Sequence, residues 1–280
     1  MTARSTQAGS EAGSTGREGF KGGAYVAGGT RGIGREIAAR LARDGYRVSL
    51  CGSTEESVAA CCDWMEEQRL EFDVEQVDVR DAAALDASIQ RAEAVAGRIT
   101  AVVYAVGHPV AGSAEALSPS QWDDCLDINL RCAFFCIRSV VPSLRRAGGG
   151  SIVLISSIWA RTTPRNRVAY VTAKTAMTGL VRAAALDHAG DNIRVNAVAP
   201  GFVDTELLRG SIARAGGDVE RELARIVDCH PLGRLVSTQE IADTTAFLSS
   251  EQASGITGQT IYVDGGISGR LSMSDEVPLG

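Results

Sequence analysis

Short apolar stretches alternate with longer amphipathic stretches along most of this chain of 280 residues. The short stretches are rich in β-branched residues, which is typical of strands buried on both faces of a sheet. They lie at residues 24–27, 47–51, 72–77, 101–105, 151–155, 194–198 and 260–263. Helical spacing of apolar residues predicts helices near 33–43, 55–68, 81–96, 119–146, 168–189 and 238–249. This alternation predicts an α/β fold with a parallel sheet that helices cover on both faces.

The composition indicates one domain with a short tail at each end. No linker-like composition interrupts residues 23–268, so we expect a single domain there. Residues 1–22 are rich in Gly, Ser and Thr and are expected to form a disordered tail, with a second tail at 269–280. Residues 204–236 break the alternation with extra helical pattern. We expect this insertion to be a substrate lid, and the alternative is a decorated surface loop.

Composition and charge argue against several classes of protein. With 45% hydrophobic and 22% charged residues, the chain has an ordinary globular composition. Its formal net charge of −6 argues against a nucleic-acid partner. No apolar run reaches the roughly 18 residues of a membrane span. The seven cysteines include no CxxC pair, so we expect no metal site and small buried thiols in a reducing cytoplasm.

A glycine-rich turn follows the first predicted strand and opens the first predicted helix. Gly28, Gly32 and Gly34 stand at GxxxGxG spacing in this turn. A phosphate group needs bare backbone N–H groups and a helix N-terminus, and Cβ atoms would block its approach. The position of the turn therefore predicts a dinucleotide site, and the alternative is a tight turn without a ligand.

The turn sequence AGGTRGIG resembles the cofactor turn of the short-chain dehydrogenase/reductase family. Further motifs of that family follow in order: VDV at 77–79, DINL at 127–130, SIVLISS at 151–157, YVTAK at 170–174, VNAVAPGFVDT at 195–205 and GITGQTIYVDGG at 255–266. The resemblance covers about residues 23–268. It implies a Rossmann-type, doubly wound sheet of seven parallel strands, a nicotinamide cofactor and usually a homotetramer. Within the family the chain resembles 3-oxoacyl-[acyl-carrier-protein] reductases and biosynthetic ketoreductases.

Tyr170 and Lys174 are four residues apart on a predicted helix and so share one of its faces. All but two of the 28 basic residues are Arg, so a lysine at this position calls for an explanation. A compact ammonium can hold two ribose hydroxyls at one point, which a planar guanidinium cannot do. An ammonium and an oxidised nicotinamide ring would both favour the phenolate, whose phenol has an ordinary pKa of about 10. Tyr170 could then exchange a proton with a substrate oxygen.

By resemblance, two more residues complete a catalytic set with Tyr170 and Lys174. Ser157 lies 13 residues before Tyr170 and would hold the substrate carbonyl, with Ser156 as the competing choice. Asn129 in the DINL motif would hold a water that links Lys174 to solvent as a proton relay. The alternative for Asn129 is a satisfied helix amide.

The end of the second predicted strand bears on the choice of cofactor. NAD-specific members of the family carry Asp where this chain has Gly52, so no carboxylate would repel a 2′-phosphate. Arg31 could pair with that phosphate, and Ser53 or Thr54 could donate hydroxyls. The pattern therefore favours NADPH over NADH as the cofactor.

Several other residues are assigned to the cofactor by resemblance alone. Asp78 would accept from the adenine amino group, beside the backbone of Val79. The family motifs also bring Thr30, Ile33, Ala105, Gly107, Pro200, Gly201, Val203 and Thr205 to the cofactor. One motif departs from the family, because Tyr104-Ala105-Val106-Gly107 replaces Asn-Asn-Ala-Gly and only the Gly matches. The support that the Asn side chain gives the sheet must then come from elsewhere.

The expected activity is NADPH-dependent reduction of a small-molecule ketone, with Tyr170 as proton donor. The alternatives are a 3-oxoacyl-[acyl-carrier-protein] reductase, an NAD-dependent secondary alcohol dehydrogenase, and a cofactor-sensing protein without catalysis. An acidic carrier needs basic residues at its docking site. The 168–189 helix instead ends beside Asp187 and Asp191, although Arg145 and Arg146 could compensate.

The substrate pocket is expected between residues 106–111, 158–167 and 204–236. Trp159 could form one wall of it or pack in the core, and Arg161, Arg165 and Arg167 cluster nearby or form a solvated loop. The 119–146 helix is apolar over more of its width than one sheet contact needs, which together with the resemblance predicts a homotetramer.

Overall fold

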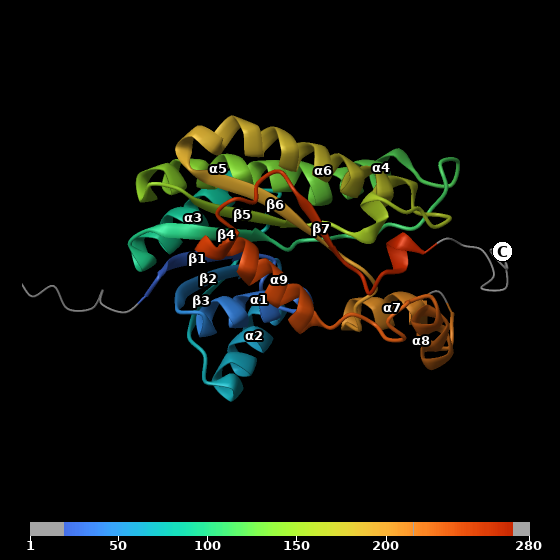
Figure 1. The fold of residues 1–280 in the computed structure, drawn as a ribbon. Coiled ribbons are helices and arrows are strands. Elements are labelled where there is room, and N and C mark those ends of the chain that lie inside the picture. Colours follow the sequence, from blue (N-terminus) through green and yellow to red (C-terminus); the bar gives the residue numbers. More distant parts are fainter. Residues whose placement is uncertain (1–19, 215, 271–280) are drawn as a thin grey trace, which may run out of the picture.

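The computed structural model describes residues 20–214 and 216–270. Seven parallel strands form one sheet in the order β3-β2-β1-β4-β5-β6-β7 (Figure 1). The strands are β1 Gly22–Ala27, β2 Tyr46–Gly52, β3 Phe72–Gln76, β4 Ile99–Tyr104, β5 Gly150–Ile155, β6 Ile193–Pro200 and β7 Thr260–Val263. The predicted Rossmann-type fold is confirmed, and each predicted strand is present to within two residues at either end.

Helices cover both faces of the sheet (Figure 1). On one side lie α3 (Ala82–Ala96), α4 (Pro119–Leu126), α5 (Cys132–Ala147) and α6 (Val168–His188), and on the other α1 (Gly32–Arg43), α2 (Glu55–Gln68) and α9 (Thr238–Ser249). Successive side chains of β1 alternate between two buried clusters. Tyr25 and Ala27 pack with residues of α3, α5 and α6, whereas Ala24 and Val26 pack with residues of α1 and α9. The apolar run of a strand that is buried on both faces follows from this alternation.

The predicted helix at 119–146 is in fact three segments, because a π-helical turn at Asp127–Arg131 separates α4 from α5. The Cys132 N–H bonds the Asp127 carbonyl five residues back. Asn129 Nδ2 donates to the Cys125 carbonyl at 2.8 Å. This carbonyl lies four residues earlier and would accept the Asn129 backbone N–H in a regular α-helix. A π-turn of this kind is frequent at functional sites, since it turns one side chain away from the helical register.

The sheet has a topological switch point between β1 and β4. The chain goes from β1 to β2 and β3 on one side, and then returns to β4, β5, β6 and β7 on the other. In open parallel sheets, ligands bind outside the carboxyl ends of the strands at such a point. The loops after β1, β4 and β5 therefore define where a site is to be sought.

The insertion at 204–236 forms two helices, α7 (Glu206–Arg214) and α8 (Val219–Asp228), beyond the carboxyl end of β6 (Figure 1). Its two ends lie side by side, because Val203 bridges Val236 and the Val236 N–H bonds the Phe202 carbonyl at 3.2 Å. Arg209 ties the helices together through Asp204 at 2.7 Å and Glu220 at 2.8 Å. The segment after β7 also holds the insertion, because Leu232 N bonds the Gly265 carbonyl at 3.3 Å and Arg270 bonds the Asp228 carbonyl at 2.8 Å.

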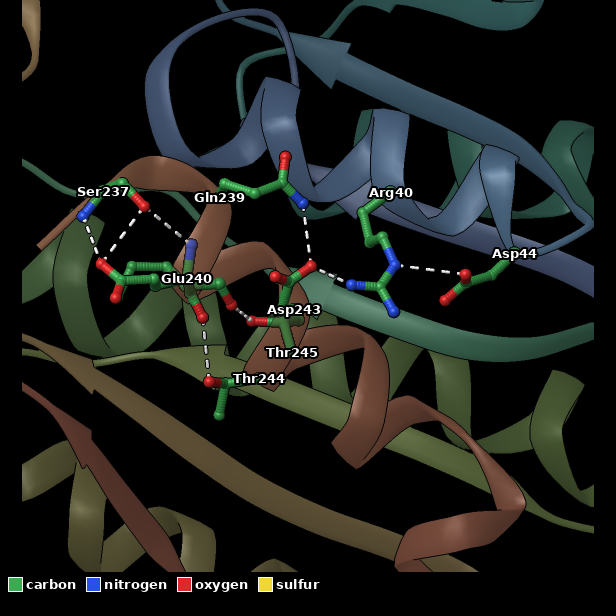
Figure 2. A network of polar contacts seen from close by, with 9 residues as sticks. Arg40, Asp44, Ser237, Gln239, Glu240, Asp243, Thr244 and Thr245 are labelled. Carbon is green, nitrogen blue, oxygen red and sulfur yellow. Dashed lines mark hydrogen bonds and ion pairs between the residues drawn. The ribbon is translucent and has the colours of Figure 1, made fainter.

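A polar seam joins α1 to α9 (Figure 2). Arg40 of α1 donates to Asp44 at 3.1 Å and pairs with Asp243 of α9, which also accepts from Gln239 at 2.8 Å. Ser237 and Glu240 form a capping box at the start of α9. Arg234 bonds Glu240 and holds the pKa of that carboxyl at about 2, helped by the Ser237 backbone.

Several expectations meet the limits of the described residues or need correction. Most of both predicted tails, at 1–19 and 271–280, lies outside the described residues, and β1 already begins at Gly22. Five of the cysteines are buried as expected, but Cys62 and Cys229 are exposed. No helix within 20–214 and 216–270 is long and apolar enough to cross a membrane. In the same ranges, no group of three potential metal ligands is present.

Candidate active site

The glycine turn after β1 has the shape that the sequence predicts for a phosphate cradle. Gly28 and Gly32 adopt left-handed φ angles of 77° and 53°, which favour glycine. A Cβ on Gly34 would lie 2.1 Å from the Gly28 carbonyl oxygen, so Gly34 is required for close packing of the turn. A Cβ on Gly32 would meet no atom within 4 Å. The backbone therefore faces open space at Gly32, where an anion could approach.

The N-terminus of α1 lacks a side-chain cap. Its N-cap residue, Arg31, has extended backbone (φ −154°) and makes no capping hydrogen bond, and the first turn contains no acidic residue. Side chains cap the starts of α2, α3, α4, α8 and α9, whereas α6, which begins after Arg167, also lacks such a cap. The first N–H groups of α1 are thus left for another acceptor, and with the open turn they fit the phosphates of a dinucleotide.

Gly52, at the end of β2, packs against the turn. A Cβ at this position would lie 2.5 Å from both Oγ1 and Cγ2 of Thr30, which is buried, and 2.9 Å from Ser57 Oγ. The absence of an acidic residue here is therefore also a steric requirement. Ser53 is exposed, and its hydroxyl has no partner within the described ranges. Thr54 is less free, because its hydroxyl accepts from Ser57 N at 3.2 Å as the cap of α2.

Asp78, predicted to receive the adenine amino group, is held by a neighbour. Arg80 donates to both of its carboxylate oxygens at 2.7 to 3.0 Å and, by these hydrogen bonds, lowers the pKa of Asp78. Asp78 is exposed and Val79 buried. An adenine contact at Asp78 would have to share the carboxylate with Arg80.

The end of β4 lies against the glycine turn, although its motif departs from that of the family. Ala105 N bonds the Ala27 carbonyl at 2.8 Å, and a Cβ on Gly28 would lie 2.8 Å from Val106 Cγ2. Tyr104 takes over the support expected of an asparagine, because its buried hydroxyl donates to the Ile128 carbonyl in the π-turn. The strand end is therefore tied to the π-turn by a phenol.

Asn129 is buried in the π-turn and fixes the loop after β4. Its Nδ2 donates to the carbonyls of His108 at 2.9 Å and Cys125 at 2.8 Å, and its Oδ1 accepts from His108 N at 3.1 Å. Both amide hydrogens are thus used, and Oδ1 keeps one acceptor site. A Cβ on Gly107 would lie 3.8 Å from this Oδ1 and 4.0 Å from Lys174 Nζ. The structure therefore brings Gly107, Asn129 and Lys174 together.

The two serines that follow β5 have different environments. Ser156 is buried, and its hydroxyl donates to the Lys174 carbonyl of α6 at 3.4 Å. Ser157 is partly exposed, and its Oγ accepts from Trp159 N at 3.2 Å, while its hydroxyl also hydrogen-bonds Tyr170. Of the two, Ser157 is the one that can reach a ligand.

Tyr170 and Lys174 lie on one face of α6, as their spacing predicts. Lys174 Nζ is 5.6 Å from the centre of the Tyr170 ring and donates to the Ile155 carbonyl at 2.8 Å. The lysine is only 1% exposed. Burial lowers its pKa to about 7.

The pKa of Tyr170 moves in the opposite direction to the sequence-based expectation. Burial raises it above the ordinary value of a phenol, and the neighbouring Cys125 adds to the effect. A hydrogen bond with Ser157 and the charge of Arg167 oppose the rise without cancelling it. In the protein alone, the balance therefore favours the neutral phenol rather than the phenolate.

The remaining predicted cofactor residues follow β6. A Cβ on Gly201 would lie 2.8 Å from Asp264 Cα, so this glycine allows the loops after β6 and β7 to pack together. Val203 is buried, and Pro200 ends the strand. Thr205 Oγ1 accepts from Leu208 N at 3.3 Å at the start of α7, which leaves its hydroxyl hydrogen and one acceptor site for a ligand.

Comparison with known proteins shows which protein family has this fold and site. The family model described as enoyl-(acyl carrier protein) reductase matches residues 27–268. A solved structure from Burkholderia xenovorans, described as that of a short-chain dehydrogenase/reductase, superposes with a TM-score of 0.85 at 33% identity over 90% of this chain and 98% of that one. The chain belongs to the short-chain dehydrogenase/reductase family.

Relatives within the short-chain dehydrogenase/reductase family differ in what they act on. The 3-oxoacyl-[acyl-carrier-protein] reductase FabG of Staphylococcus aureus is 34% identical over 245 residues, which covers 87% of this chain and 97% of that protein. The solved structure of a variant actinorhodin polyketide ketoreductase with NADPH superposes with a TM-score of 0.84 at 30% identity, over 88% of this chain and 97% of that one. The protein is thus an NAD(P)-dependent oxidoreductase acting on CH–OH or C=O groups.

Sequence reasoning passed over three residues around the short-chain dehydrogenase/reductase site. Phe202 was seen only as part of a motif, yet it lies edge-on to Trp159, with ring centres 6.1 Å apart. Trp159 in turn lies edge-on to Tyr170 at 5.7 Å, so it flanks the tyrosine rather than packing in the core. Cys125 is buried, with Sγ 3.6 Å from Asn129 Nδ2. The backbone N–H and carbonyl of His108 both bond the same Asn129 amide. Their sequence signal is weak, because each lies on a different loop or helix.

Proposed function

We propose that the protein is an NADPH-dependent ketoreductase that reduces a small-molecule ketone to a secondary alcohol. The observation that supports it best is the meeting of Ser157, Tyr170 and Lys174 beside the carboxyl ends of β4 and β5. In this proposal the uncapped turn of α1 holds the cofactor phosphates. Lys174 holds the ribose hydroxyls, and residues 200–205 face the nicotinamide end.

The proposed chemistry divides between the cofactor and three side chains. When bound, the nicotinamide cofactor supplies the hydride. Ser157 turns its hydroxyl hydrogen from Tyr170 to the ketone oxygen, and Tyr170 gives its proton to that oxygen as negative charge develops there. Because burial raises the pKa of Tyr170, the phenol stays protonated near neutral pH, as an acid for ketone reduction must be.

Lys174 is suited to return the proton to Tyr170. Its pKa of about 7 allows it to exchange protons near neutrality, which an ordinary lysine cannot do. The free acceptor site of Asn129 Oδ1 could hold a relay water beside it. This role makes Asn129 both a positioning residue for the His108 loop and a part of the proposed relay.

The preference for NADPH is supported by the end of β2. Gly52 places no carboxylate near a 2′-phosphate, Ser53 has a free hydroxyl, and Arg31 is exposed with no partner for its guanidinium within the described ranges. A charged guanidinium and a hydroxyl are the donors that a phosphate requires. The actinorhodin polyketide ketoreductase, whose structure contains NADPH, has the same fold.

A free small molecule is favoured over an acyl group on a carrier protein. Arg145 and Arg146, the basic residues that could have attracted an acidic carrier, are paired with Asp191 at 2.7 Å and Glu93 at 2.6 Å. The last turns of α6 expose an apolar side chain, Leu186 (81% exposed), rather than a basic one that could attract an acidic carrier. Carrier reduction remains the second candidate, because FabG of Staphylococcus aureus is a relative at 34% identity.

We also propose that the 204–236 insertion acts as the substrate lid and that the enzyme works in the cytoplasm.

We propose further that the enzyme is a homotetramer. The outer face of α4, the π-turn, α5 and α6 has a hollow of about 590 Å³ that is mostly apolar. It is lined by Leu126, Leu130, Phe134 and Leu180 together with the charged residues Asp123, Asp127 and Arg131. Phe134 is 48% exposed at its edge. A second copy of this chain would cover these side chains. Light scattering should give a mass near four chains, and Phe134→Glu should lower it.

The experiment that tests the function is a turnover assay with a panel of ketones. Consumption of NADPH is followed by absorbance with cyclic, aromatic and aliphatic ketones and with acetoacetyl-carrier protein. We expect free ring ketones to give higher kcat/KM than the carrier-bound substrate. A clear preference for the carrier would make the enzyme a fatty-acid-type reductase. Faster turnover of secondary alcohols with NAD⁺ than of any ketone with NADPH would make it a dehydrogenase, as the names of sugar-oxidising relatives suggest for those proteins.

A further inference from the structure

We propose that the substrate is a flat ring ketone that carries a carboxylate, with its rings against Trp159 and Phe202 and its carboxylate on Arg167. This inference rests on the proposed function and names the substrate class of the same site. Two independent observations support it: a series of aromatic contacts that begins at Tyr170, and an arginine that lies over an indole ring without a carboxylate partner.

The aromatic series extends from the proton donor toward the lid. Trp159 lies edge-on to Tyr170, with an interplanar angle of 89°, and Phe202 lies edge-on to Trp159 at 80°. Phe202 is edge-on to His230, which follows α8, with ring centres 6.0 Å apart. Tyr170, Trp159 and Phe202 are all partly exposed. Aromatic rings in such a wall favour another flat ring, since stacked and edge-on pairs add to the gain from burial.

Arg167 completes this wall with a positive charge. Its guanidinium lies over the Trp159 ring, 5.7 Å from the ring centre. Its one hydrogen bond to protein is from Nη1 to the Asn166 carbonyl at 3.4 Å, so most of its five N–H donors remain available. At this distance the guanidinium makes a cation–π contact with the indole, and its remaining N–H donors could meet a carboxylate. The residue also influences the reacting group, because its charge lowers the pKa of Tyr170.

Ion pairs engage some of the arginines in the described ranges, and Arg167 is one of those that they leave without a carboxylate partner. Ion pairs neutralise Arg40, Arg80, Arg91, Arg131, Arg145, Arg146, Arg209, Arg225 and Arg234. Within 20–214 and 216–270, no carboxylate pairs with Arg161, Arg165 or Arg167, and the loop at 158–167 contains no acidic residue. In a chain of net charge −6, the tyrosine is thus bordered by uncompensated positive charge. A carboxylate on the substrate would complete the pair.

The backbone on either side of Arg167 is bonded to Gly112 in the loop after β4. Gly112 N bonds the Asn166 carbonyl at 2.9 Å, and Val168 N bonds the Gly112 carbonyl at 3.4 Å. These bonds tie the segment before α6 to the loop after β4, whose His108 is held by Asn129. Arg167 is therefore presented by a braced segment rather than by a free loop, as a specificity residue needs to be.

The test compares α-tetralone with α-tetralone that carries a carboxylate on its benzene ring, both with NADPH. In the wild-type enzyme, we expect the carboxylate to raise kcat/KM about tenfold, the worth of one charge-assisted hydrogen bond. Arg167→Gln should remove this advantage by raising KM for the carboxylated ketone. Arg165→Gln is the matched control from the same loop, and it should change the ratio by less than about twofold.

Two further measurements separate the parts of the proposal. High salt should raise KM for the carboxylated ketone and not for the neutral one, since the gain is electrostatic. Trp159→Leu should raise KM for both tetralones more than for cyclohexanone. Equal kcat/KM for the two tetralones in the wild type, or the same loss in the Arg165 and Arg167 variants, would overturn the inference. Failure to reduce any ketone with NADPH would overturn the proposed function instead.

Discussion

The start of α1 and the start of α9 lie on the same face of the sheet and are built in opposite ways. At α9, Ser237 and Glu240 form a capping box, and each polar side chain labelled along the seam has a partner (Figure 2). At α1, no side chain caps the helix, the preceding residue is an exposed arginine, and Gly32 faces open space. Leaving helix N–H groups without a cap costs stability, typically about 1 kcal/mol. The difference indicates that α9 is built for the fold and α1 for a ligand.

Two side chains at the carboxyl edge of the sheet also serve function rather than stability. Lys174 is buried with its pKa lowered to about 7, and desolvation raises the pKa of Tyr170. Both shifts disfavour charge in the folded protein, so neither group is there to stabilise the fold. Substitutions on this edge should therefore change function strongly and stability weakly, whereas substitutions in the seam should do the reverse.

The largest effect is expected for Tyr170→Phe. Removing only the hydroxyl deletes the proposed proton donor, and general acids of this kind contribute up to about 10⁴-fold, so we expect a loss of at least about 10³-fold in kcat. The affinity for NADPH, measured by fluorescence titration, should change little. A variant that keeps near-normal turnover would contradict the proposed role of Tyr170.

Gly52→Asp should weaken NADPH binding more than about tenfold, for two separable reasons. Its carboxylate would repel the 2′-phosphate, and its Cβ would overlap Thr30. Gly52→Ala introduces only the overlap and is the matched control, while Ser53→Asp places the charge at an exposed position. We expect Ser53→Asp to weaken NADPH far more than NADH in binding titrations. An equal effect on both cofactors would show that the phosphate does not lie at this strand end.

Lys174 should make stability depend on pH in a predictable direction. Its pKa is about 7 in the folded protein against an ordinary 10.5, so between these values the unfolded chain binds more protons. Raising the pH from 7 to 9 should therefore stabilise the cofactor-free protein, by about 2 kcal/mol from this group. Lys174→Met should lack this gain in urea unfolding measured at the two pH values. Parallel pH dependence in the two proteins would show that Lys174 is not held neutral by burial.

The smallest effects test the two helix starts directly. Ser237→Ala removes the cap of α9 and should lower the free energy of unfolding by about 1 kcal/mol, with turnover unchanged. Arg31→Asp offers α1 the cap that it lacks. It should raise stability by up to about 1 kcal/mol while weakening NADPH, because the new carboxylate takes the N–H groups and repels the phosphates. A destabilised Arg31→Asp protein that still binds NADPH normally would argue against a ligand role for this helix start.

Local patterns were enough to predict much of the fold and some of the site. The strands, most helices, the glycine turn and the Tyr170–Lys174 face depend on short-range spacing, which the sequence displays. The π-turn was missed because apolar spacing does not show that the Asn129 side chain takes the Cys125 carbonyl, and its bond to His108, 21 residues away, was missed as a tertiary contact. The contact of Thr30 with Gly52 and the pairing of Arg145 with Asp191 were missed for the same reason, since each joins residues far apart in sequence. Spacing cannot show which polar group a tertiary neighbour has already engaged.

The central claim is that the uncapped start of α1, at the carboxyl edge of the sheet, accepts a dinucleotide with a 2′-phosphate. Calorimetric titration of the wild-type protein with NADPH and with NADH at one salt concentration tests it most directly. The account predicts that NADPH binds at least about tenfold more tightly, through Arg31 and Ser53, and that the difference narrows as salt rises. Equal affinities, or tighter binding of NADH, would contradict it.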